Sequence, residues 1–127
     1  MAYLQMGSNA YLFSQEIIEK NVPDNCFGNY ALGYKNEQTG VFIVLYVGRS
    51  DTNLRKRLLD HLGEDKRFKH FKFIKQVDIR QAYLLECKNY HDFGGEDGKL
   101  LNKVHPDCPS GYAINCPICA LKQKISK

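Results

Sequence analysis

Two tyrosines and two arginines lie around one glycine in the first half of this 127-residue chain. Tyr30 and Tyr46 fall in predicted strands, Arg49 follows Gly48 directly, and Arg57 comes two helical turns later. A glycine lets the backbone approach a ligand closely, and the N-terminus of a following helix offers free N–H groups to an anion. Arginine adds charge-assisted hydrogen bonds to phosphate oxygens. This pattern predicts a site for a phosphate-bearing ligand.

A single carboxylate is expected on the inward face of a later helix, over residues 79–92. The apolar face of that helix is formed by Ile79, Ala82, Tyr83 and Tyr90, and the i+7 position on the same face belongs to Glu86. Burying a carboxylate without a partner costs several kcal/mol. Glu86 therefore needs either a salt bridge to an arginine or lysine or a metal ion, and the spacing leaves both open.

The C-terminal tail has the spacing of a metal site. His105 and Cys108 are separated by two residues, and so are Cys116 and Cys119. A Cys-x-x-Cys pair in a turn-rich segment suits tetrahedral zinc, so we expect a Cys₃His site, in which His91 could replace Cys108 or His105. A reduced, metal-free turn is the alternative. A thioredoxin-like role is not favoured, because no strand precedes Cys116 and no helix clearly follows it.

The helices and strands predicted from the sequence, which must position these groups, indicate an α/β (α+β) fold. Its core would be a small three-stranded, mainly antiparallel sheet flanked by helices. Residues 1–11 are expected to form a loose arm and residues 12–20 a short helix capped by Ser14. Strands are predicted at 29–35, 41–47 and 71–77. The almost wholly apolar run 41–47 is predicted to be the central strand, ending at Gly48. A helix with Leu54, Leu58 and Leu62 as its stripe should follow, and Asp78 should cap the helix over 79–92.

These motifs together resemble the GIY-YIG nuclease family. The resemblance rests on Gly28-Asn29-Tyr30 and Tyr46-Val47-Gly48, on the helix carrying Asn53-Leu54 and Arg57 with His61, and on Glu86 in AYLLEC; it covers residues 28–90. Asn29 replaces the aliphatic residue of the first triplet. The segment between Gly48 and Asn53 is one residue longer than in the nucleotide-excision-repair members (the UvrC type), so Arg55 is the fallback for Arg57.

The resemblance implies hydrolysis of DNA phosphodiester bonds with one divalent metal, Mg²⁺ or Mn²⁺, held by Glu86. Arg57 and Arg49 would stabilise charge on the phosphate, Tyr30 would orient or deprotonate water, and Tyr46 would support it. His61 could be an alternative base or a leaving-group acid. The implied phosphate- or nucleic-acid-binding residues are Gly48, Arg49, Ser50, Arg55 and Asn102, with Asn89 as the alternative to Asn102. The expected zinc ligands are His105, Cys108, Cys116 and Cys119.

The resemblance divides the chain into an N-terminal arm with a short helix (1–25), a catalytic core (26–98) and a Cys/His-rich tail (99–127) packed on it as one domain. DNA is the expected partner, and RNA is not excluded. A protein partner or a homodimer could supply specificity. A non-catalytic nucleic-acid-binding module with a zinc knuckle is the alternative, but the full set of Tyr30, Tyr46, Arg57 and Glu86 favours catalysis. A purely structural protein–protein domain would leave the clustered arginines and lysines unexplained.

Composition sets weaker bounds. Hydrophobic residues make up 43% of the chain and charged residues 25%, as is typical of one globular domain. The net charge is +4, with nine basic residues between Arg49 and Lys75. Interleaved with Phe68, Phe71 and Phe73, this run fits either a nucleic-acid surface or a solvated face over core phenylalanines, and by itself it favours the second. No apolar run approaches the roughly 18 residues of a membrane span. No secretory signal is recognisable, so we expect a cytoplasmic protein without membrane contact.

Overall fold

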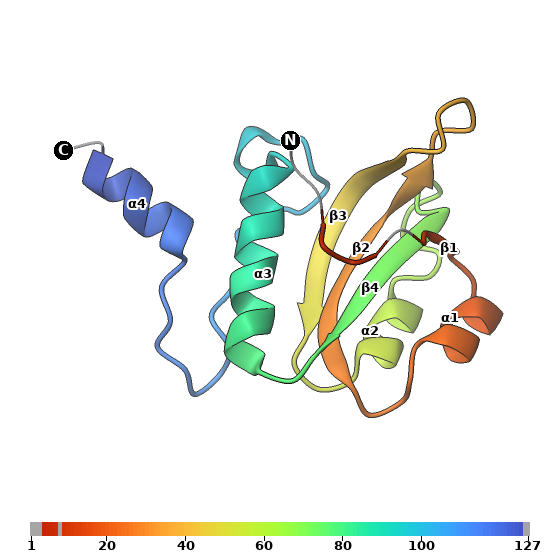
Figure 1. Cartoon of the computed structure of the whole chain (residues 1–127), viewed down its shortest axis with the longest axis horizontal. Helices are drawn as coiled ribbons and strands as arrows, with labels where there is room; N and C mark the ends of the chain where they lie inside the picture. Colours follow the sequence, from red (N-terminus) through yellow and green to blue (C-terminus); the bar gives the residue numbers. More distant parts are fainter. Residues whose placement is uncertain (1–3, 8, 126–127) are drawn as a thin grey trace.

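The fold is α+β, with helices on both faces of an antiparallel sheet. The computed structural model describes residues 4–7 and 9–125, with only the backbone from residue 122 onward. In chain order the elements are β1 (Tyr11–Leu12), α1 (Gln15–Asn21), β2 (Phe27–Lys35), β3 (Phe42–Ser50), α2 (Leu54–Asp60), β4 (His70–Gln76), α3 (Ile79–Asp92), the 3₁₀ turn η1 (Gly95–Asp97) and α4 (Pro117–Ile125). The strand order is β1-β4-β2-β3, and every neighbouring pair is antiparallel (Figure 1).

The sheet has one strand more than expected. β1 pairs Tyr11 with Phe71 and Leu12 with His70 of β4. For the described residues of the predicted loose N-terminal arm the prediction was also wrong, since Leu4 and Met6 are 5% and 7% exposed and join a core cluster; residues 1–3 and 8 lie outside the described residues. A two-residue strand has no detectable sequence period, and two apolar residues in a polar segment do not reveal which surface they cover.

The predicted central strand was also placed wrongly. β3 is the edge strand, whereas β2 lies between β4 and β3. The run in β3 is apolar because α3 packs beside this strand and because the chain at Leu101 covers its free edge, where the Leu101 N–H donates to the Leu45 carbonyl at 2.6 Å. Apolar content measures burial, and covering segments can bury part of an edge strand: Val47 is fully buried and residues 42–46 are half-buried.

β3 does not end at Gly48. It continues to Ser50, with Gly48 opposite Tyr30 and Arg49 opposite Asn29 in the β2–β3 register. The helix begins only at Leu54, where the Asn53 side chain accepts a hydrogen bond from the Lys56 N–H. The predicted junction of strand, glycine and helix is therefore absent, and backbone pairing in the sheet occupies the segment that was expected to cradle phosphate.

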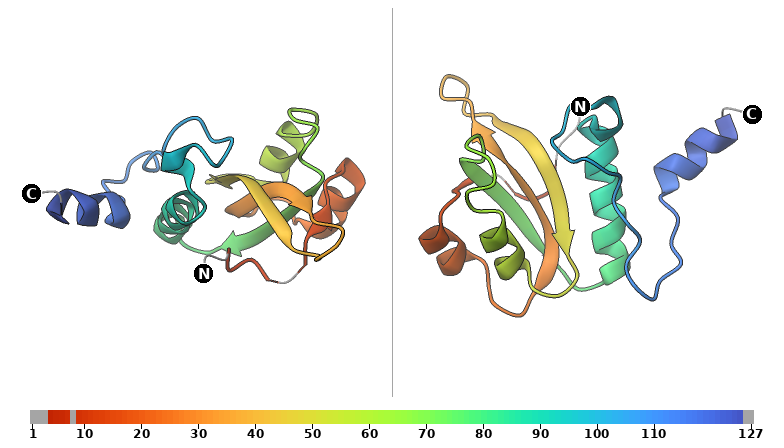
Figure 2. Two further views of the ribbon diagram at one scale, coloured as in Figure 1. Left: turned by 90° about the horizontal axis from the view of Figure 1, so that it is seen from above. Right: turned by 180° about the vertical axis from the view of Figure 1, so that it is seen from behind.

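The two faces of the sheet carry separate cores. One face packs Tyr30 and Leu32 against α1 and α2, in a cluster of Ile18, Val22, Tyr30, Leu32, Leu54, Leu58 and Phe71. The other face packs Ala31 and Val47 against Tyr90 of α3, Leu100 and the N-terminal segment. Figure 2 shows α2 and α3 on opposite sides of the sheet, with α4 at the end of the molecule beyond α3. Alternation along β2 and β3 therefore divides side chains between these two faces.

The helix caps agree with the sequence. Ser14 accepts a hydrogen bond from the Ile17 N–H, and Asp78 accepts one from the Arg80 N–H. Phe71 is fully buried and Phe68 and Phe73 pack against the first core, so these phenylalanines are core residues. None of the described helices is both long and apolar enough to cross a membrane.

Candidate active site

A chain of hydrogen bonds leads from a buried tyrosine to the surface. The Tyr30 hydroxyl lies 2.6 Å from His61 Nε2, and His61 Nδ1 lies 2.5 Å from a Glu64 carboxylate oxygen. A carboxylate only accepts, so His61 Nδ1 donates to Glu64, and with the ring proton on Nδ1 the Nε2 atom accepts from the tyrosine O–H. Tyr30 and His61 are 1% and 2% exposed, whereas the Glu64 side chain is 53% exposed. The end of α2 turns the ring of His61 inward, against Tyr30.

Arg57 completes this group on the α2 side. Its guanidinium lies beside Tyr30 and Tyr46, and the interaction with Tyr30 contributes most to raising the pKa of Arg57. The Tyr46 ring stacks on Tyr30 at 6.3 Å and lies 5.0 Å from the His61 ring. Burial raises the pKa of both tyrosines. Tyr30 is therefore protonated at neutral pH, and it can act as a base only if its own proton passes to His61.

Gly48 makes this packing possible. A Cβ atom at this position would lie 2.4 Å from the Tyr30 hydroxyl oxygen, closer than any non-bonded contact allows. The tyrosine ring therefore lies across the backbone of β3, in the space that a side chain would fill. The need for a glycine here arises from contact with Tyr30, since the expected ligand-binding loop does not form.

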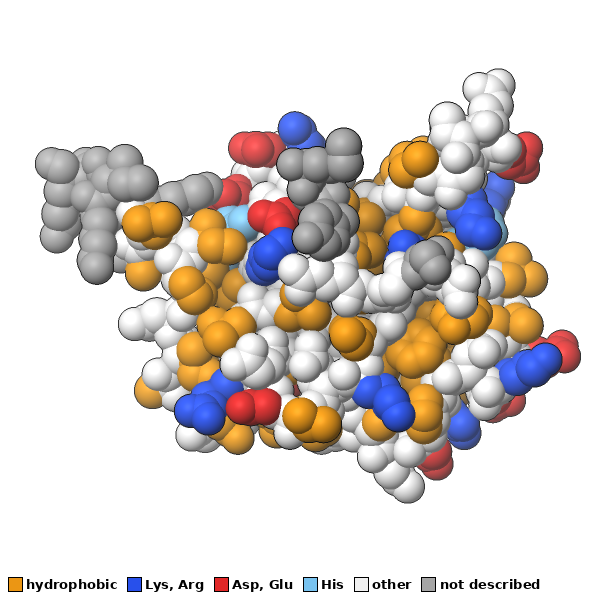
Figure 3. All heavy atoms as spheres, in the orientation of Figure 1, with side chains coloured by type: hydrophobic (Ala, Val, Ile, Leu, Met, Phe, Trp, Pro, Cys, Tyr) orange, Lys and Arg blue, Asp and Glu red, His pale blue; other side chains and the backbone are white. Residues whose placement is uncertain are grey.

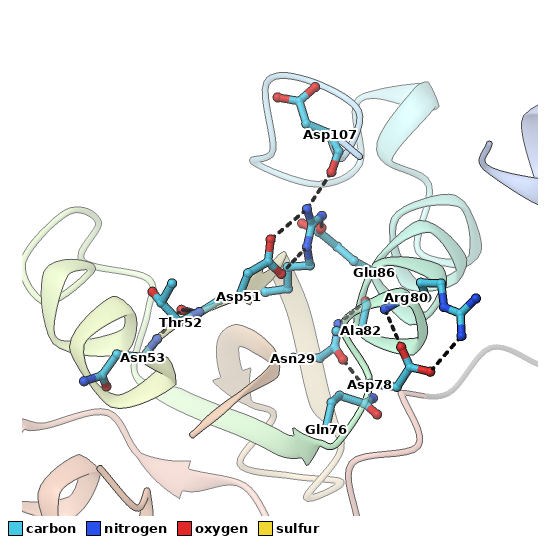
Figure 4. Close-up of polar contacts among 12 residues, drawn as sticks. Asn29, Asp51, Thr52, Asn53, Gln76, Asp78, Arg80, Ala82, Glu86 and Asp107 are labelled. Atoms are coloured by element: carbon cyan, nitrogen blue, oxygen red, sulfur yellow. Dashed lines mark hydrogen bonds and ion pairs between the residues drawn. The ribbon is translucent and has the colours of Figure 1, made fainter. Parts of the chain in front are cut away.

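A second polar group lies on the other face of the sheet, around Arg49. Its Nη1 lies 2.5 Å from Glu86 Oε1, its Nε lies 2.8 Å from Asp51 Oδ1, and its Nη2 lies 2.6 Å from the main-chain carbonyl of Asp107. Figure 4 shows Asp51, Glu86 and Asp107 converging from three segments on this guanidinium. The Tyr83 ring lies beneath it, 5.2 Å from Cζ. Of the two partners left open for Glu86, the structure contains the arginine.

Burial dominates the electrostatics of Glu86. The carboxyl is on the inward face of α3, 8% exposed, and its burial raises its pKa to about 7 despite the opposing charge of Arg49. The charge of Glu86 in turn raises the pKa of Tyr30 and Tyr46. The two polar groups therefore interact electrostatically, although Tyr30 and Tyr46 share one face of the sheet while Arg49 lies on the other. The candidate site wraps around the edge strand β3 at Gly48.

Three of the expected phosphate-binding residues have structural partners instead. Arg55 donates to the carbonyls of Val22 and Glu19 at the end of α1. The Ser50 hydroxyl accepts from the N–H of Asn53 at 3.0 Å and so stabilises the turn before α2.

The Asn102 side-chain amide makes two hydrogen bonds to the backbone of Val47. Its oxygen accepts from the Val47 N–H at 3.0 Å, and its nitrogen donates to the Val47 carbonyl at 2.7 Å. Its position at the edge of β3 therefore fixes the following segment to the sheet. Asn89, the other asparagine considered, is fully buried and its amide has no hydrogen-bond partner among the described residues.

A separate cluster of metal-ligating atoms lies in the tail. The four ligand atoms of His91, His105, Cys116 and Cys119 lie within 4.8 Å of one another. His91 Nε2 is 3.2 Å from His105 Nε2 and 3.4 Å from Cys119 Sγ. It is 3.5 Å from Cys116 Sγ, and the distance from His105 Nε2 to Cys119 Sγ is also 3.5 Å. These four residues could hold a metal ion.

The expected ligand Cys108 is not part of the cluster. Its Sγ contacts the Tyr112 carbonyl at 3.1 Å and accepts from the Ile114 N–H at 3.3 Å, so it stabilises a turn. His91, named from the sequence only as a replacement, takes its place because the last turn of α3 lies beside the tail. The expectation that no helix follows Cys116 was also wrong, since α4 begins at Pro117.

The acceptors around the cluster leave its two imidazoles ready to bind a metal. His91 Nδ1 lies 2.8 Å from the Glu96 carboxylate, and His105 Nδ1 lies 2.8 Å from the Pro106 carbonyl. Both acceptors require a proton on Nδ1, which leaves Nε2 as a free electron pair directed into the cluster. Burial alone would raise the pKa of the Cys116 thiol, but the Cys119 N–H and the His105 side chain hold it below its ordinary value.

The surface next to Tyr46 is hollowed. A groove of about 570 Å³ is lined by Tyr46, Glu64, Asp65, Phe68, Leu101, Lys103 and Val104. On the face drawn in Figure 3, Lys and Arg side chains are scattered among hydrophobic and polar ones and form no continuous patch. Several cations of the basic run are paired, including Arg67 with Asp65 and Lys56 with Asp60.

Sequence reasoning missed three residues of this site: Glu64, Asp51 and the Asp107 carbonyl. Glu64 could have been found, because it is only three residues after His61, close enough for the two side chains to meet in the turn that follows α2. A main-chain carbonyl in an irregular loop leaves no sequence signal. Comparisons of the chain with protein-family models, with curated proteins and with solved structures found no match, so its function has to be argued from this geometry.

Proposed function

We propose that this protein is a metal-dependent endonuclease of the GIY-YIG type, which hydrolyses DNA phosphodiester bonds. The observation that carries the proposal is the chain from Tyr30 through His61 to Glu64, with the Arg57 guanidinium beside the same tyrosine. A buried tyrosine and imidazole held 2.6 Å apart beside a guanidinium form an acid–base pair next to an anion-binding group.

Each residue then has a definite task. Tyr30 hands its proton to His61 Nε2 as its own oxygen takes one from the attacking water, and Glu64 stabilises the imidazolium that forms. Arg57 donates to the phosphate oxygen on which negative charge develops, and Tyr46 supports that phosphate by a hydrogen bond. Water attacks phosphorus, the bond to the leaving oxygen breaks, and that oxygen takes its proton from solvent.

Glu86 fits one divalent cation. Mg²⁺ and Mn²⁺ favour carboxylate oxygens, and Mg²⁺ is usually bound through one or two carboxylates together with a substrate phosphate. Glu86 and Asp51 supply two such carboxylates on the same guanidinium, and the raised pKa of Glu86 means that it becomes available as a ligand near neutral pH. When bound, the ion would polarise a phosphate oxygen and neutralise charge.

The test is cleavage of supercoiled, nicked and branched DNA with Mg²⁺ or Mn²⁺, comparing the natural protein with Glu86→Ala. Glu37→Ala is a matched control, because this glutamate is exposed in the β2–β3 hairpin. Cleavage by the natural protein and by the control, but not by Glu86→Ala, is expected. DNA binding without cleavage of any substrate would contradict the proposal and favour the non-catalytic binding module.

We also propose that His91, His105, Cys116 and Cys119 hold a structural Zn²⁺ ion. A zinc tetrahedron with Zn–N of about 2.0 Å and Zn–S of about 2.3 Å has edges of about 3.3 Å between nitrogens and about 3.5 Å between nitrogen and sulfur. The observed N–N distance is 3.2 Å and the N–S distances are 3.4 to 3.5 Å. The spacing of the donor atoms therefore matches a zinc tetrahedron, which supports the proposed site.

Elemental analysis of protein purified without chelator should give one zinc per chain. Cys119→Ser should lose the ion, whereas Cys108→Ser should keep it, because Cys108 lies outside the cluster. Cobalt substitution should give the visible absorption of a tetrahedral site with two thiolates. Zinc-free protein, or loss of zinc in Cys108→Ser alone, would contradict the assignment.

A further inference from the structure

We propose that the metal centre of His91, His105, Cys116 and Cys119 also positions Arg49 in the active site, through the segment Pro106–Asp107. The inference rests on the zinc proposal, and its consequence for catalysis rests on the proposed nuclease function. Asp107 contributes only its main-chain carbonyl, which any residue at this position would also provide. The interaction with Arg49 therefore depends on where the segment lies and not on the Asp107 side chain.

The first step is the short path from the cluster to the arginine. His105 offers Nε2 to the cluster, and its Nδ1 donates to the carbonyl of the next residue, Pro106, at 2.8 Å. Pro106 is buried. The following carbonyl, of Asp107, accepts from Arg49 Nη2 at 2.6 Å. Fixing the imidazole of His105 therefore fixes a carbonyl two residues away, whose direction decides where Arg49 can point.

The second step is that no regular secondary structure holds this carbonyl. No helix or strand occurs between Leu101 and Cys116, so regular hydrogen bonding does not determine the path of this segment. At its start the segment is attached to β3 by Leu101 and Asn102. Beyond Asp107, Cys108 and Ile114 pack against Tyr83 and Cys87 of α3, and the ligand cluster adds the remaining attachment. Without a metal, the four converging donor atoms lose their common partner, and the attachment to α3 loosens.

The third step is that α3 carries both sites. Glu86 and His91 are on the same helix, within six residues of each other. A metal that joins His91 to His105 therefore ties the Asp107 carbonyl to the helix that holds the Glu86 carboxylate. Arg49 lies between the two and donates to both.

The carbonyl selects one orientation of the guanidinium. The Asp51 carboxylate accepts from both Nε and Nη2 of Arg49 in a bidentate pair. By itself this pair would let the guanidinium move together with the Asp51 side chain, which is 31% exposed. The second hydrogen on Nη2 goes to the Asp107 carbonyl, which pins the far side of the plane. Nη1 is then directed at Glu86. Arg49 is in this sense aligned by the zinc centre.

The direct test observes Arg49 itself. In ¹⁵N-labelled full-length protein, the Arg49 Nε–H signal is assigned as the one missing from Arg49→Lys, and it is recorded with zinc bound, after zinc removal by a chelator, and after zinc is restored. We expect the signal to shift or broaden on zinc removal and to return on restoration, while the Arg55 signal stays. Cys119→Ser should reproduce the zinc-free signal, and Cys108→Ser the natural one. Circular dichroism checks that the sheet remains folded.

Cleavage assays connect this to function. Zinc removal should lower the rate of DNA cleavage about 100-fold, the scale expected when a group that stabilises charge on the phosphate is displaced by about an ångström. The same removal should change the rate of Arg49→Lys little, since the residue to be positioned is already lost.

An unchanged Arg49 signal in folded, zinc-free protein would overturn the positioning role. A signal that responds to zinc in a protein that cleaves no DNA would leave the positioning intact and contradict only the nuclease proposal. An equal loss of cleavage in the natural protein and in Arg49→Lys on zinc removal would place the effect of zinc elsewhere and overturn the inference.

Discussion

Replacing Tyr30 with phenylalanine separates what its hydroxyl does for stability from what it does for chemistry. The ring is 1% exposed and stays in the core, so only the oxygen is lost. That oxygen bonds to His61 Nε2 at 2.6 Å, and His61 is itself 2% exposed. Leaving this buried nitrogen without a partner costs about 1–3 kcal/mol of unfolding free energy. For a chain of this length that corresponds to a fall in Tm of about 3–10 °C.

The effect on cleavage should be far larger than this. Removing the acid–base group lowers the rate by about 100- to 10,000-fold, since proton transfer by a positioned side chain contributes that much. The assay is single-turnover cleavage of a labelled DNA at a temperature at which thermal denaturation shows that the variant is folded. Tyr34→Phe is the control, because Tyr34 lies on the same strand and is 36% exposed.

Two results would refute this reasoning. A Tyr30→Phe protein that is folded and cleaves at the rate of Tyr34→Phe would show that the hydroxyl has no part in the reaction. A Tm equal to that of the natural protein would show that the bond between Tyr30 and His61 contributes no stability. In the second case the hydrogen-bond chain from Tyr30 to Glu64 would lack its first bond, the one between Tyr30 and His61.

Four further predictions concern single residues. Burial raises the pKa of Glu86 from 4.5 to about 7, so the folded state binds this proton more tightly than the unfolded state. The unfolding free energy should therefore fall by about 3 kcal/mol as the pH rises from 4.5 to 7. Urea unfolding at pH 4.5 and 7.5 should show this fall, and Glu86→Gln should remove it. Arg55→Ala should lower the unfolding free energy by about 1–2 kcal/mol, through lost bonds to the end of α1, with little change in cleavage. Arg57→Ala should do the reverse, lowering cleavage by about 100-fold or more with little loss of stability, so equal effects in the two variants would contradict the assignment. Gly48→Ala should displace the Tyr30 ring, because its Cβ would lie 2.4 Å from the hydroxyl, and a cleavage rate equal to that of the natural protein would contradict this.

Local patterns in the sequence predicted most of the elements. The caps at Ser14 and Asp78 and the strand at 71–77 match the structure to within one or two residues, because capping and periodicity depend on neighbouring residues only. The inward-facing carboxylate of Glu86 was predictable for the same reason, since helical spacing alone assigns it to the apolar face. The strand order was not predictable. The apolar run of β3 suggested a central strand, but β3 is an edge strand that is covered by α3 and by the chain at Leu101, both distant in sequence.

The sequence by itself determined which side chains could do chemistry: the paired tyrosines, the arginines, Glu86 and the Cys/His tail. Only the tertiary structure decided how they combine. It turned His61 inward to Tyr30, bonded Arg55 to α1, paired Glu86 with Arg49, and exchanged Cys108 for His91 in the cluster. Each of these outcomes depends on contacts between residues far apart in the chain. Spacing along the sequence limits which groups can meet, but the packing of α2 and α3 on opposite faces of one sheet decides which of them do.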